Sequence, residues 1–276
     1  MRKFDYHELT SALLPAVLHA GRVEMHHFRS GVTVETKADR TPVTAADREA
    51  ETILLDALAQ VAPSVPVVAE EAVARGDIPA QSQQFFLVDA LDGTHLFIQG
   101  KPEFSVNIGL VENGRPVFGI IYVPPTGDLY VTRAANVSEH TIVHPDATAQ
   151  DAQRLSFARL ATREPDRANL IAFNSRASGG ASTGFLDALD VRHAKPLGSS
   201  IKFCRIAAGE GDVYARFGAT SEWDTAAGDA ILRAAGGCVT TVDGAALSYG
   251  KAEAGYRNPH FIAWGREPLL TGFVAK

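Results

Sequence analysis

The chain has 276 residues and a formal net charge of −6 at pH 7, with 46% hydrophobic and 21% charged residues. This length and composition are ordinary for a compact globular protein with two sub-domains. The acidic balance argues against sequence-independent binding to a nucleic-acid polymer, which needs a basic surface, but it does not exclude a small anionic substrate. Cys204 and Cys238 are too few for a disulfide framework and are not spaced like a zinc knuckle.

The first apolar stretch, residues 12–20, is interrupted by Pro15 and follows the polar residues Asp5, His7 and Glu8. It is too short and too interrupted for the apolar region of a signal peptide or for a membrane span. We therefore expect a cytoplasmic protein that is not integrated in a membrane. The sequence leaves open whether it is a monomer or a homodimer.

The first half is predicted to begin with two helices. Residues 5–29 have the apolar spacing of an amphipathic helix, and residues 45–61 repeat apolar side chains at three- and four-residue steps until Pro63 ends the run. The period then changes, and short strands are predicted at residues 65–69, 85–88, 104–111, 117–122 and 128–132. Asn113-Gly114 between two of these strands is a strong hairpin signal.

The polar stretch at residues 134–155 is interpreted as a loop, and it contains the predicted sub-domain boundary, between residues 1–145 and residues 146–276. In the second half, strands are predicted at residues 169–173, 213–217 and 238–242, and helices at residues 199–208 and 225–235. Strands that alternate with helices indicate an α/β architecture in which helices cover the sheets.

Five carboxylates stand at strand ends or helix starts: Asp47, Glu70, Asp89, Asp92 and Asp224. Each has an ordinary structural explanation. Asp47 fits a capping box, Asp92 with the following glycine is a turn signal, and Asp224 fits a helix N-cap. Glu70 and its acidic neighbour after a strand would usually be solvated.

Taken together, the same carboxylates favour a site for hard divalent cations. Mg²⁺ is typically held by a few carboxylates together with phosphate and water. Asp89 and Asp92 flank Leu91, whose backbone carbonyl can also face a metal. Gly93 and Thr94 then present N–H groups at an expected helix start, which is a suitable cradle for phosphate. Two ions about 3.5–4 Å apart can activate water and stabilise a leaving oxygen, so hydrolysis of a phosphate ester is predicted.

Four motifs resemble, in order, the signatures of the inositol monophosphatase superfamily. Residues 89–94, D-A-L-D-G-T, are similar to its D-P-I/L-D-G-T signature, and residues 223–228, W-D-T-A-A-G, to its W-D-x-A-A-G signature. Glu70-Glu71 resembles its acidic pair, and residues 44–47 its T-x-x-D element. The resemblance covers about residues 10–265 and implies the sugar-phosphatase fold, an α/β sandwich with alternating layers of helices and sheets (αβαβα).

Within the superfamily, the chain is most similar to bacterial 3'(2'),5'-bisphosphate nucleotidases of the CysQ type. The similarity lies in residues 198–204 (G-S-S-I-K-F-C), residues 212–218 (D-V-Y-A-R-F-G) and Asn258-Pro259. It implies removal of the 3'-phosphate from adenosine 3',5'-bisphosphate, a by-product of sulfate assimilation, to give AMP and phosphate. It also implies dependence on two or three Mg²⁺ ions and inhibition by Li⁺.

The resemblance implies roles for individual residues as well. The metal ligands, all but one in the N-terminal sub-domain, would be Glu70, Asp89, the Leu91 carbonyl, Asp92 and Asp224. Asp47 and Thr94 would orient the attacking water, with Thr94 donating a hydrogen bond toward Asp47, and the Gly93 and Thr94 amides would receive the phosphate. In the C-terminal substrate sub-domain, Ser199, Lys202 and Arg216 would line the nucleotide side, where Lys and Arg suit a second phosphate. Apart from the resemblance, the solvated end of a helix or a strand stays open as an alternative interpretation of Lys202 and Arg216.

The sequence departs from the family pattern in three places. Ala90 replaces a proline, His95-Leu96 replaces a Lys-Glu pair, and Ser178 stands where these nucleotidases often carry a histidine. Serine cannot stack on a base as an imidazole can. An inositol or other sugar monophosphatase therefore stays open as an alternative. A non-catalytic regulator that binds metal or anions would be expected to lack a metal ligand, and none is lost in the sequence.

Overall fold

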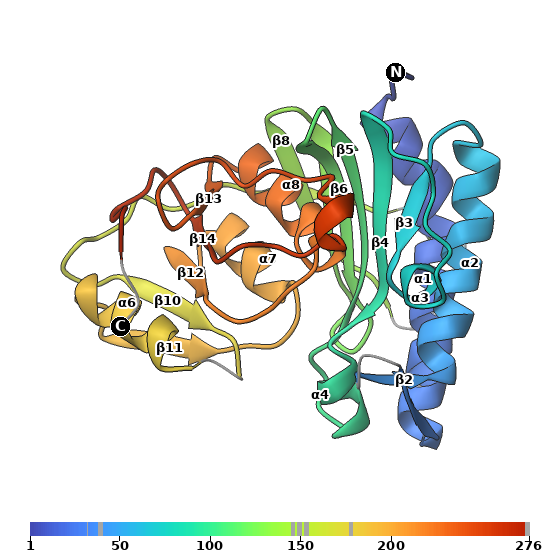
Figure 1. Ribbon diagram of the computed structural model, residues 1–276, viewed down its shortest axis with the longest axis horizontal. Helices are drawn as coiled ribbons and strands as arrows, with labels where there is room; N and C mark the ends of the chain where they lie inside the picture. Colours follow the sequence, from blue (N-terminus) through green and yellow to red (C-terminus); the bar gives the residue numbers. More distant parts are fainter. Residues whose placement is uncertain are drawn as a thin grey trace.

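The computed structural model describes residues 1–31, 33–37, 41–144, 147, 151, 155–176 and 179–273. Helices and sheets alternate in layers across the molecule (Figure 1). The helices are α1 (Tyr6–Ser30), α2 (Ala45–Val61), α3 (Glu70–Ala74), α4 (Thr94–Ile98), α6 (Gly180–Ala188), α7 (Ile201–Ala207) and α8 (Ala226–Ala234). From one side to the other, the layers are α1 with α2, a seven-stranded sheet, α7 with α8, a five-stranded sheet, and α6. The predicted αβαβα fold is confirmed.

The outer layer consists of the two long N-terminal helices, as predicted for residues 5–29 and 45–61. The carboxylate of Asp5 caps α1 by accepting hydrogen bonds from the backbone N–H groups of His7 and Glu8. The apolar faces of α1 and α2, including Leu13 and Leu54, are fully buried against the sheet. This burial, rather than helix propensity, supplies most of the stabilisation of the two helices.

The seven-stranded sheet has the order β3-β4-β5-β6-β7-β8-β9, and every neighbouring pair except β3 with β4 is antiparallel. Its strands are β3 (Val67–Ala69), β4 (Gln84–Asp92), β5 (Ser105–Glu112), β6 (Arg115–Val123), β7 (Asp128–Ala134), β8 (Val137–Ile142) and β9 (Ala158–Arg159). Asn113 and Gly114 join β5 to β6 with positive φ angles of 51° and 75°, so the predicted hairpin is confirmed.

The α8 helix packs so closely on this sheet that two strand positions have no room for a side chain. A Cβ on Gly119 would lie 2.3 Å from the carbonyl oxygen of Ala227, and one on Gly109 would lie 2.8 Å from the Cβ of Ala226. These contacts join the helical layer of the C-terminal half to the sheet of the N-terminal half. They also fix the position of the segment immediately before α8.

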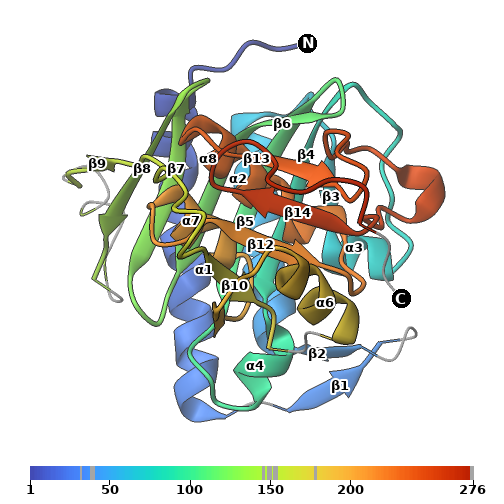
Figure 2. The same cartoon turned by 90° about the vertical axis from the view of Figure 1, so that its left-hand side faces the viewer.

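The five-stranded sheet has the order β11-β10-β12-β14-β13 and lies in front of α7 and α8 in Figure 2. Its strands are β10 (Ile171–Asn174), β11 (His193–Pro196), β12 (Val213–Arg216), β13 (Cys238–Thr241) and β14 (Phe261–Trp264). Side chains alternate between its two faces: Tyr214 and Phe261 pack toward α7, whereas Val213 and Trp264 pack with Phe185 of α6.

One prediction of a loop was wrong. Residues 134–155 contain the strand β8, which pairs with β7 from Asp128 to Ala134. The sequence of β8, V-S-E-H-T-I, lacks an apolar face because the strand is only partly covered, so period-two hydrophobicity is absent. The short β1 (Val34–Thr36) and β2 (Pro42–Thr44) hairpin was not predicted either.

The predicted sub-domain boundary falls on residues 145 and 146, which lie outside the described residues, and it stays a prediction. β9 joins the seven-stranded sheet beyond that point, and α7 and α8 lie between the two sheets. Within the described ranges, no helix combines the length and apolarity that crossing a membrane requires.

Candidate metal and phosphate site

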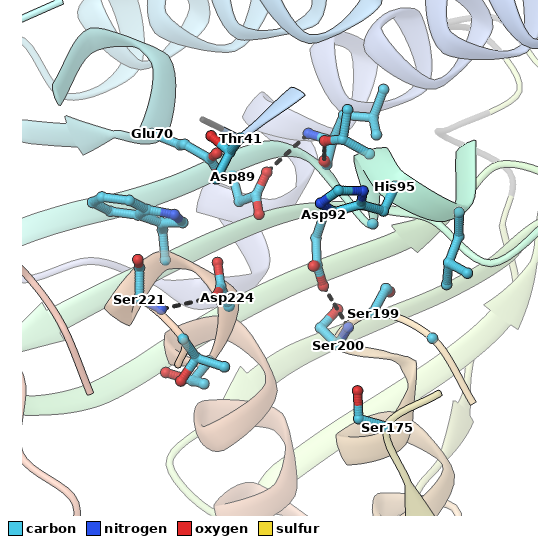
Figure 3. A pocket seen from close by; sticks show the side chains of 18 of the residues that line it. Thr41, Glu70, Asp89, Asp92, His95, Ser175, Ser199, Ser200, Ser221 and Asp224 are labelled. Carbon is cyan, nitrogen blue, oxygen red and sulfur yellow. Dashed lines mark hydrogen bonds between the residues drawn. The ribbon is translucent and has the colours of Figure 1, made fainter. Parts of the chain in front are cut away.

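Three acidic side chains from separate elements converge on one wall of a cavity (Figure 3). Glu70 is the first residue of α3, Asp89 lies near the end of β4, and Asp224 ends the 3-10 turn η1 (Glu222–Asp224). One carboxylate oxygen of each lies within 4.8 Å of those of the other two. Carboxylate oxygens gathered in this way form the type of ligand set that hard divalent cations prefer.

The end of β4 has a backbone shape that presents these groups. Its pairing with β5 shifts register between Asp89 and Asp92, and the N–H of Leu91 donates to Oδ1 of Asp89 at 3.0 Å. Gly93 then adopts a φ of +104°, and a Cβ there would lie 2.8 Å from the carbonyl oxygen of Glu103. Glycine is therefore required where the strand turns into α4.

The charges of this wall make it suitable for a cation. Burial is the largest cause that raises the pKa of Asp89 well above its usual range, and Glu70 and Asp92 raise it further. Burial, followed by Asp92 and Glu70, does the same for the pKa of Asp224. Carboxylates this close cannot all stay ionised without a compensating positive charge. The donor set therefore fits a divalent metal ion.

Lys37, between β1 and β2, already brings a positive charge to this wall. Its Nζ lies 2.5 Å from a carboxylate oxygen of Glu70 and 2.5 Å from one of Glu71. Burial alone would lower the pKa of Lys37, but the two carboxylates outweigh burial and raise it. Sequence reasoning missed this residue because a single lysine in a polar segment carries no motif.

Asp47 accepts hydrogen bonds on both carboxylate oxygens. Oδ2 accepts from the N–H of Thr44 at 2.8 Å and from its Oγ1 at 2.7 Å, which completes the predicted capping box of α2. Oδ1 accepts from Oγ1 of Thr94 at 2.9 Å. Since a hydroxyl has one proton, donation to Asp47 leaves the Thr94 oxygen able to accept a hydrogen bond from a water molecule.

Asp92 lies outside the close three-residue cluster but lines the same cavity. Its Oδ2 accepts a hydrogen bond from the backbone N–H of Ser200. The neighbouring Ser199 has a φ of +50°, and its Oγ lies 2.7 Å from Oγ of Ser105. Asp92 thus connects the acidic wall to the loop that precedes α7 (Figure 3).

The cavity has a volume of about 760 Å³, and cations line it as well as carboxylates. Besides Lys37, these cations are Lys101, Arg176, Lys202, Arg216 and Arg257. Sequence reasoning assigned no function to Arg176, which stands two residues before the departure at Ser178, or to Arg257, which belongs to no motif. The tertiary structure brings these cations to one cavity from separate segments of the chain.

Lys202 and Arg216 are held by backbone carbonyls. Lys202 is buried, its Nζ donates to the carbonyls of Leu197 and Ser199, and burial lowers its pKa to about 8. Arg216 donates from Nη2 to the carbonyl of Ala219 at 2.9 Å. Its Nε is buried and has no hydrogen-bond partner among the described residues. Lys202 therefore holds the loop before α7 directly, and Arg216 is held at the cavity that it lines.

Two of the three departures from the family pattern lie on described residues. Ala90 is buried within β4, where the chain reaches its turn without a proline. His95 and Leu96 both line the cavity, and a Cβ on Gly198 would lie 2.3 Å from Cδ1 of Leu96. Leu96 therefore packs against the loop before α7. Ser178, the third departure, lies outside the described residues.

A comparison with protein families decides the relationship. The family model described as "Inositol monophosphatase family" matches residues 5–267. The chain belongs to the inositol monophosphatase family. It is 35% identical over 229 residues to the 3'(2'),5'-bisphosphate nucleotidase CysQ of Escherichia coli strain K12, a match that covers 83% of this chain and 87% of the relative. It is 37% identical over 226 residues to CysQ of Salmonella typhimurium, with 82% and 86% covered.

Solved structures of the inositol monophosphatase family give the same picture. CysQ from Bacteroides thetaiotaomicron is 33% identical and superposes with a TM-score of 0.76, covering 96% of this chain and 99% of that chain. An inositol monophosphatase from Thermotoga maritima is 24% identical, with a TM-score of 0.73 and coverages of 95% and 92%. This second likeness shows the fold alone.

Proposed function

We propose that the protein is a Mg²⁺-dependent phosphomonoesterase that removes the 3'-phosphate of adenosine 3',5'-bisphosphate to give AMP and phosphate. The observation that carries the proposal is one cavity that is lined both by a carboxylate cluster and by lysine and arginine side chains. A substrate with two phosphates would use both sets of residues, because one phosphate would be cleaved at metal ions and the other held by cations. The names of the CysQ relatives support the same substrate class.

Glu70, Asp89, the Leu91 carbonyl, Asp92 and Asp224 would hold two or three Mg²⁺ ions. The closeness of three of these carboxylates and the raised pKa values of Asp89 and Asp224 support this assignment. When bound, the ions would activate the attacking water and stabilise the charge of the leaving oxygen.

The residues around the metals would position the reactants. Asp47 holds the proton of Thr94 through their 2.9 Å hydrogen bond, so the Thr94 oxygen would accept a hydrogen bond from the attacking water and orient it. The amides of Gly93 and Thr94 would receive the phosphate. Since water is the nucleophile, no protein side chain needs to form a covalent intermediate.

Ser199, Lys202 and Arg216 would line the nucleotide side of the cavity. A pKa of about 8 keeps Lys202 protonated at pH 7, so its positive charge would attract the second phosphate. Arg216 lines the cavity and is held there through the Ala219 carbonyl, which supports a contact between its guanidinium and a substrate oxygen. Arg216→Ala should therefore raise KM for a bisphosphate more than for a monophosphate, and equal increases would contradict this assignment.

An inositol or other sugar monophosphatase is the second candidate. The observation that favours it is the pair His95 and Leu96, which lines the cavity where the CysQ-type pattern has a lysine and a glutamate. Without those two charges, this part of the cavity suits a less charged substrate.

A cytoplasmic location and a small phosphorylated substrate, rather than a nucleic-acid polymer, belong to the same proposal. The two free cysteines, Cys204 and Cys238, are compatible with a reducing compartment.

The test is phosphate release with Mg²⁺ from adenosine 3',5'-bisphosphate and, in parallel, from inositol 1-phosphate, with Li⁺ added as a control. We expect a large kcat/KM preference for the bisphosphate and inhibition by Li⁺. A preference for inositol 1-phosphate would favour the second candidate. Release from neither substrate, with Mg²⁺ binding intact by calorimetry, would favour a non-catalytic regulator that binds metal.

A further inference from the structure

Glu103 lies beside the cavity and has no place in the metal site or in the motifs of the family. It belongs to the segment between α4 and β5, in the N-terminal half of the chain. Its carboxylate contacts donors that all come from the C-terminal half. Nε of Arg176 donates to Oε2 at 2.7 Å, Nη2 of Arg176 donates to Oε1, and the backbone N–H of Gly198 donates to Oε2 at 2.7 Å.

Both partners lie at the cavity. Arg176 and Gly198 line it, and the side chains of Arg176 and Glu103 are 37% and 15% exposed. Charge-assisted hydrogen bonds, bidentate ones above all, are stronger than neutral ones and fix the geometry of both partners. The carboxylate of Glu103 therefore holds two separate segments of the C-terminal half at a fixed distance from β5.

The loop at Gly198 and Ser199 depends on such external contacts. A Cβ on Gly198 would lie 2.9 Å from the Cβ of Glu103, so the two segments touch directly. Ser199 has a φ of +50°, a conformation that residues other than glycine rarely adopt unless their surroundings require it. Ser105, two residues after Glu103, holds the other side of the loop through the hydroxyl of Ser199 at 2.7 Å.

Arg176 is oriented by its bidentate pair with Glu103. The carboxylate takes Nε and Nη2, which lie along one edge of the guanidinium, so the donors of Nη1 point away from Glu103. A planar guanidinium fixed along one edge is pre-organised to bind an anion with its other edge, because little conformational freedom is left to lose. The anion that the cavity can offer is a phosphate of the substrate.

We propose that Glu103 is a positioning residue that fixes Arg176 and the Gly198–Ser199 loop, and that Arg176 binds the phosphate that is not cleaved. The part about Arg176 rests on the proposed function, since only a bisphosphate carries that second phosphate. The pair then discriminates bisphosphates from monophosphates without touching the metal site.

The experiment compares Glu103→Gln, Arg176→Ala and the double variant on adenosine 3',5'-bisphosphate and on adenosine 3'-monophosphate, which lacks the second phosphate. Each single variant should raise KM for the bisphosphate about tenfold, the loss expected for one charge-assisted hydrogen bond. KM for the monophosphate should change less than about twofold after Arg176→Ala. The double variant should be no worse than the poorer single variant, because the two residues act through one contact.

Glu139→Gln is the matched control. Glu139 pairs with Nε of Arg133 at 2.9 Å and is similarly covered, but neither residue lines the cavity. Glu139→Gln should leave KM for both substrates unchanged. Its shift in melting temperature from the wild-type enzyme should be about as large as the shift caused by Glu103→Gln. A large fall in melting temperature for Glu103→Gln, with kcat reduced equally for both substrates, would mean that Glu103 only holds the two halves together and would overturn the proposal.

The wild-type enzyme separates this inference from the proposed function. If it hydrolyses the bisphosphate and the variants leave KM unchanged, the proposed function stands and the roles of Glu103 and Arg176 are refuted. If it hydrolyses inositol 1-phosphate and not the bisphosphate, the proposed function fails, and the assignment of a second phosphate to Arg176 fails with it.

Discussion

Glu24 on α1 is a buried acidic residue that does not line the cavity of the candidate site. It is fully buried, and neither carboxylate oxygen has a hydrogen-bond partner among the described residues. Burial, followed by the negative charge of Asp47, raises its pKa well above the usual range. The native protein therefore holds a proton on Glu24 that the unfolded chain releases at neutral pH. The contribution of Glu24 to the free energy of unfolding is complete below the pKa that Glu24 has in the unfolded chain. It is lost as the pH rises toward the pKa that Glu24 has in the native protein.

We predict that Glu24→Met stabilises the protein and that Glu24→Gln removes the pH dependence caused by this residue. For each pH unit over which Glu24 is protonated in the native state and ionised in the unfolded state, stability falls by about 1.4 kcal/mol. The gap in unfolding free energy between Glu24→Gln and the parent should thus widen by about that amount from pH 5 to pH 6. Glu24→Met also removes an unpaired buried polar group, which is worth about 1–3 kcal/mol.

The assay is urea unfolding followed by circular dichroism at pH 5, 6 and 7, with EDTA in every sample so that metal binding does not contribute. Glu8→Gln, an exposed glutamate on the same helix, is the control and should change stability by less than about 0.5 kcal/mol. If Glu24→Met destabilises the protein at pH 7, or if the gap between Glu24→Gln and the parent stays constant with pH, the reasoning about Glu24 is wrong.

Three further predictions concern the site and the packing beneath it. Asp89→Asn should reduce turnover by at least about 10³-fold, and near-normal turnover would contradict the metal assignment. The same variant should raise the melting temperature in EDTA, because it relieves repulsion between buried carboxylates. Thr94→Val should lower kcat about 10²-fold while Thr94→Ser stays within about tenfold, and equal losses would argue against a role for the hydroxyl. Gly119→Ala should destabilise the protein by at least about 2 kcal/mol in thermal unfolding, because its Cβ would lie 2.3 Å from the Ala227 carbonyl oxygen. Gly179→Ala is the control in the same measurement, because a Cβ there would meet open space.

The sequence predicted the elements whose signals are local. The two N-terminal helices, the Asn113-Gly114 hairpin and the capping box of Thr44 with Asp47 follow from spacing and turn chemistry over a few residues. The strand β8 was missed because its polar residues show no alternation, and its existence depends on pairing with β7.

The residues of the candidate site also fall into two groups, those that short motifs predict and those that only the tertiary structure identifies. The carboxylates Asp89, Asp92 and Asp224 stand in short motifs, so the sequence identified them as candidates and the family resemblance grouped them. Lys37 and Glu103 stand in no motif. Their contacts with Glu70 and Arg176 span many residues and exist only because the chain folds back on itself.

The sequence by itself therefore determined the family, the order of the layers and the acidic character of the metal-site wall. Each of these follows from motifs whose residues lie close together along the chain. The tertiary structure alone decided that one oxygen from each of three carboxylates on three elements lies within 4.8 Å of the others, and that Lys37, Lys101, Arg176, Lys202, Arg216 and Arg257 line one cavity with them. The physical reason is that these are distances between segments far apart in sequence. Packing of α8 on the seven-stranded sheet fixes such distances, and local propensity does not.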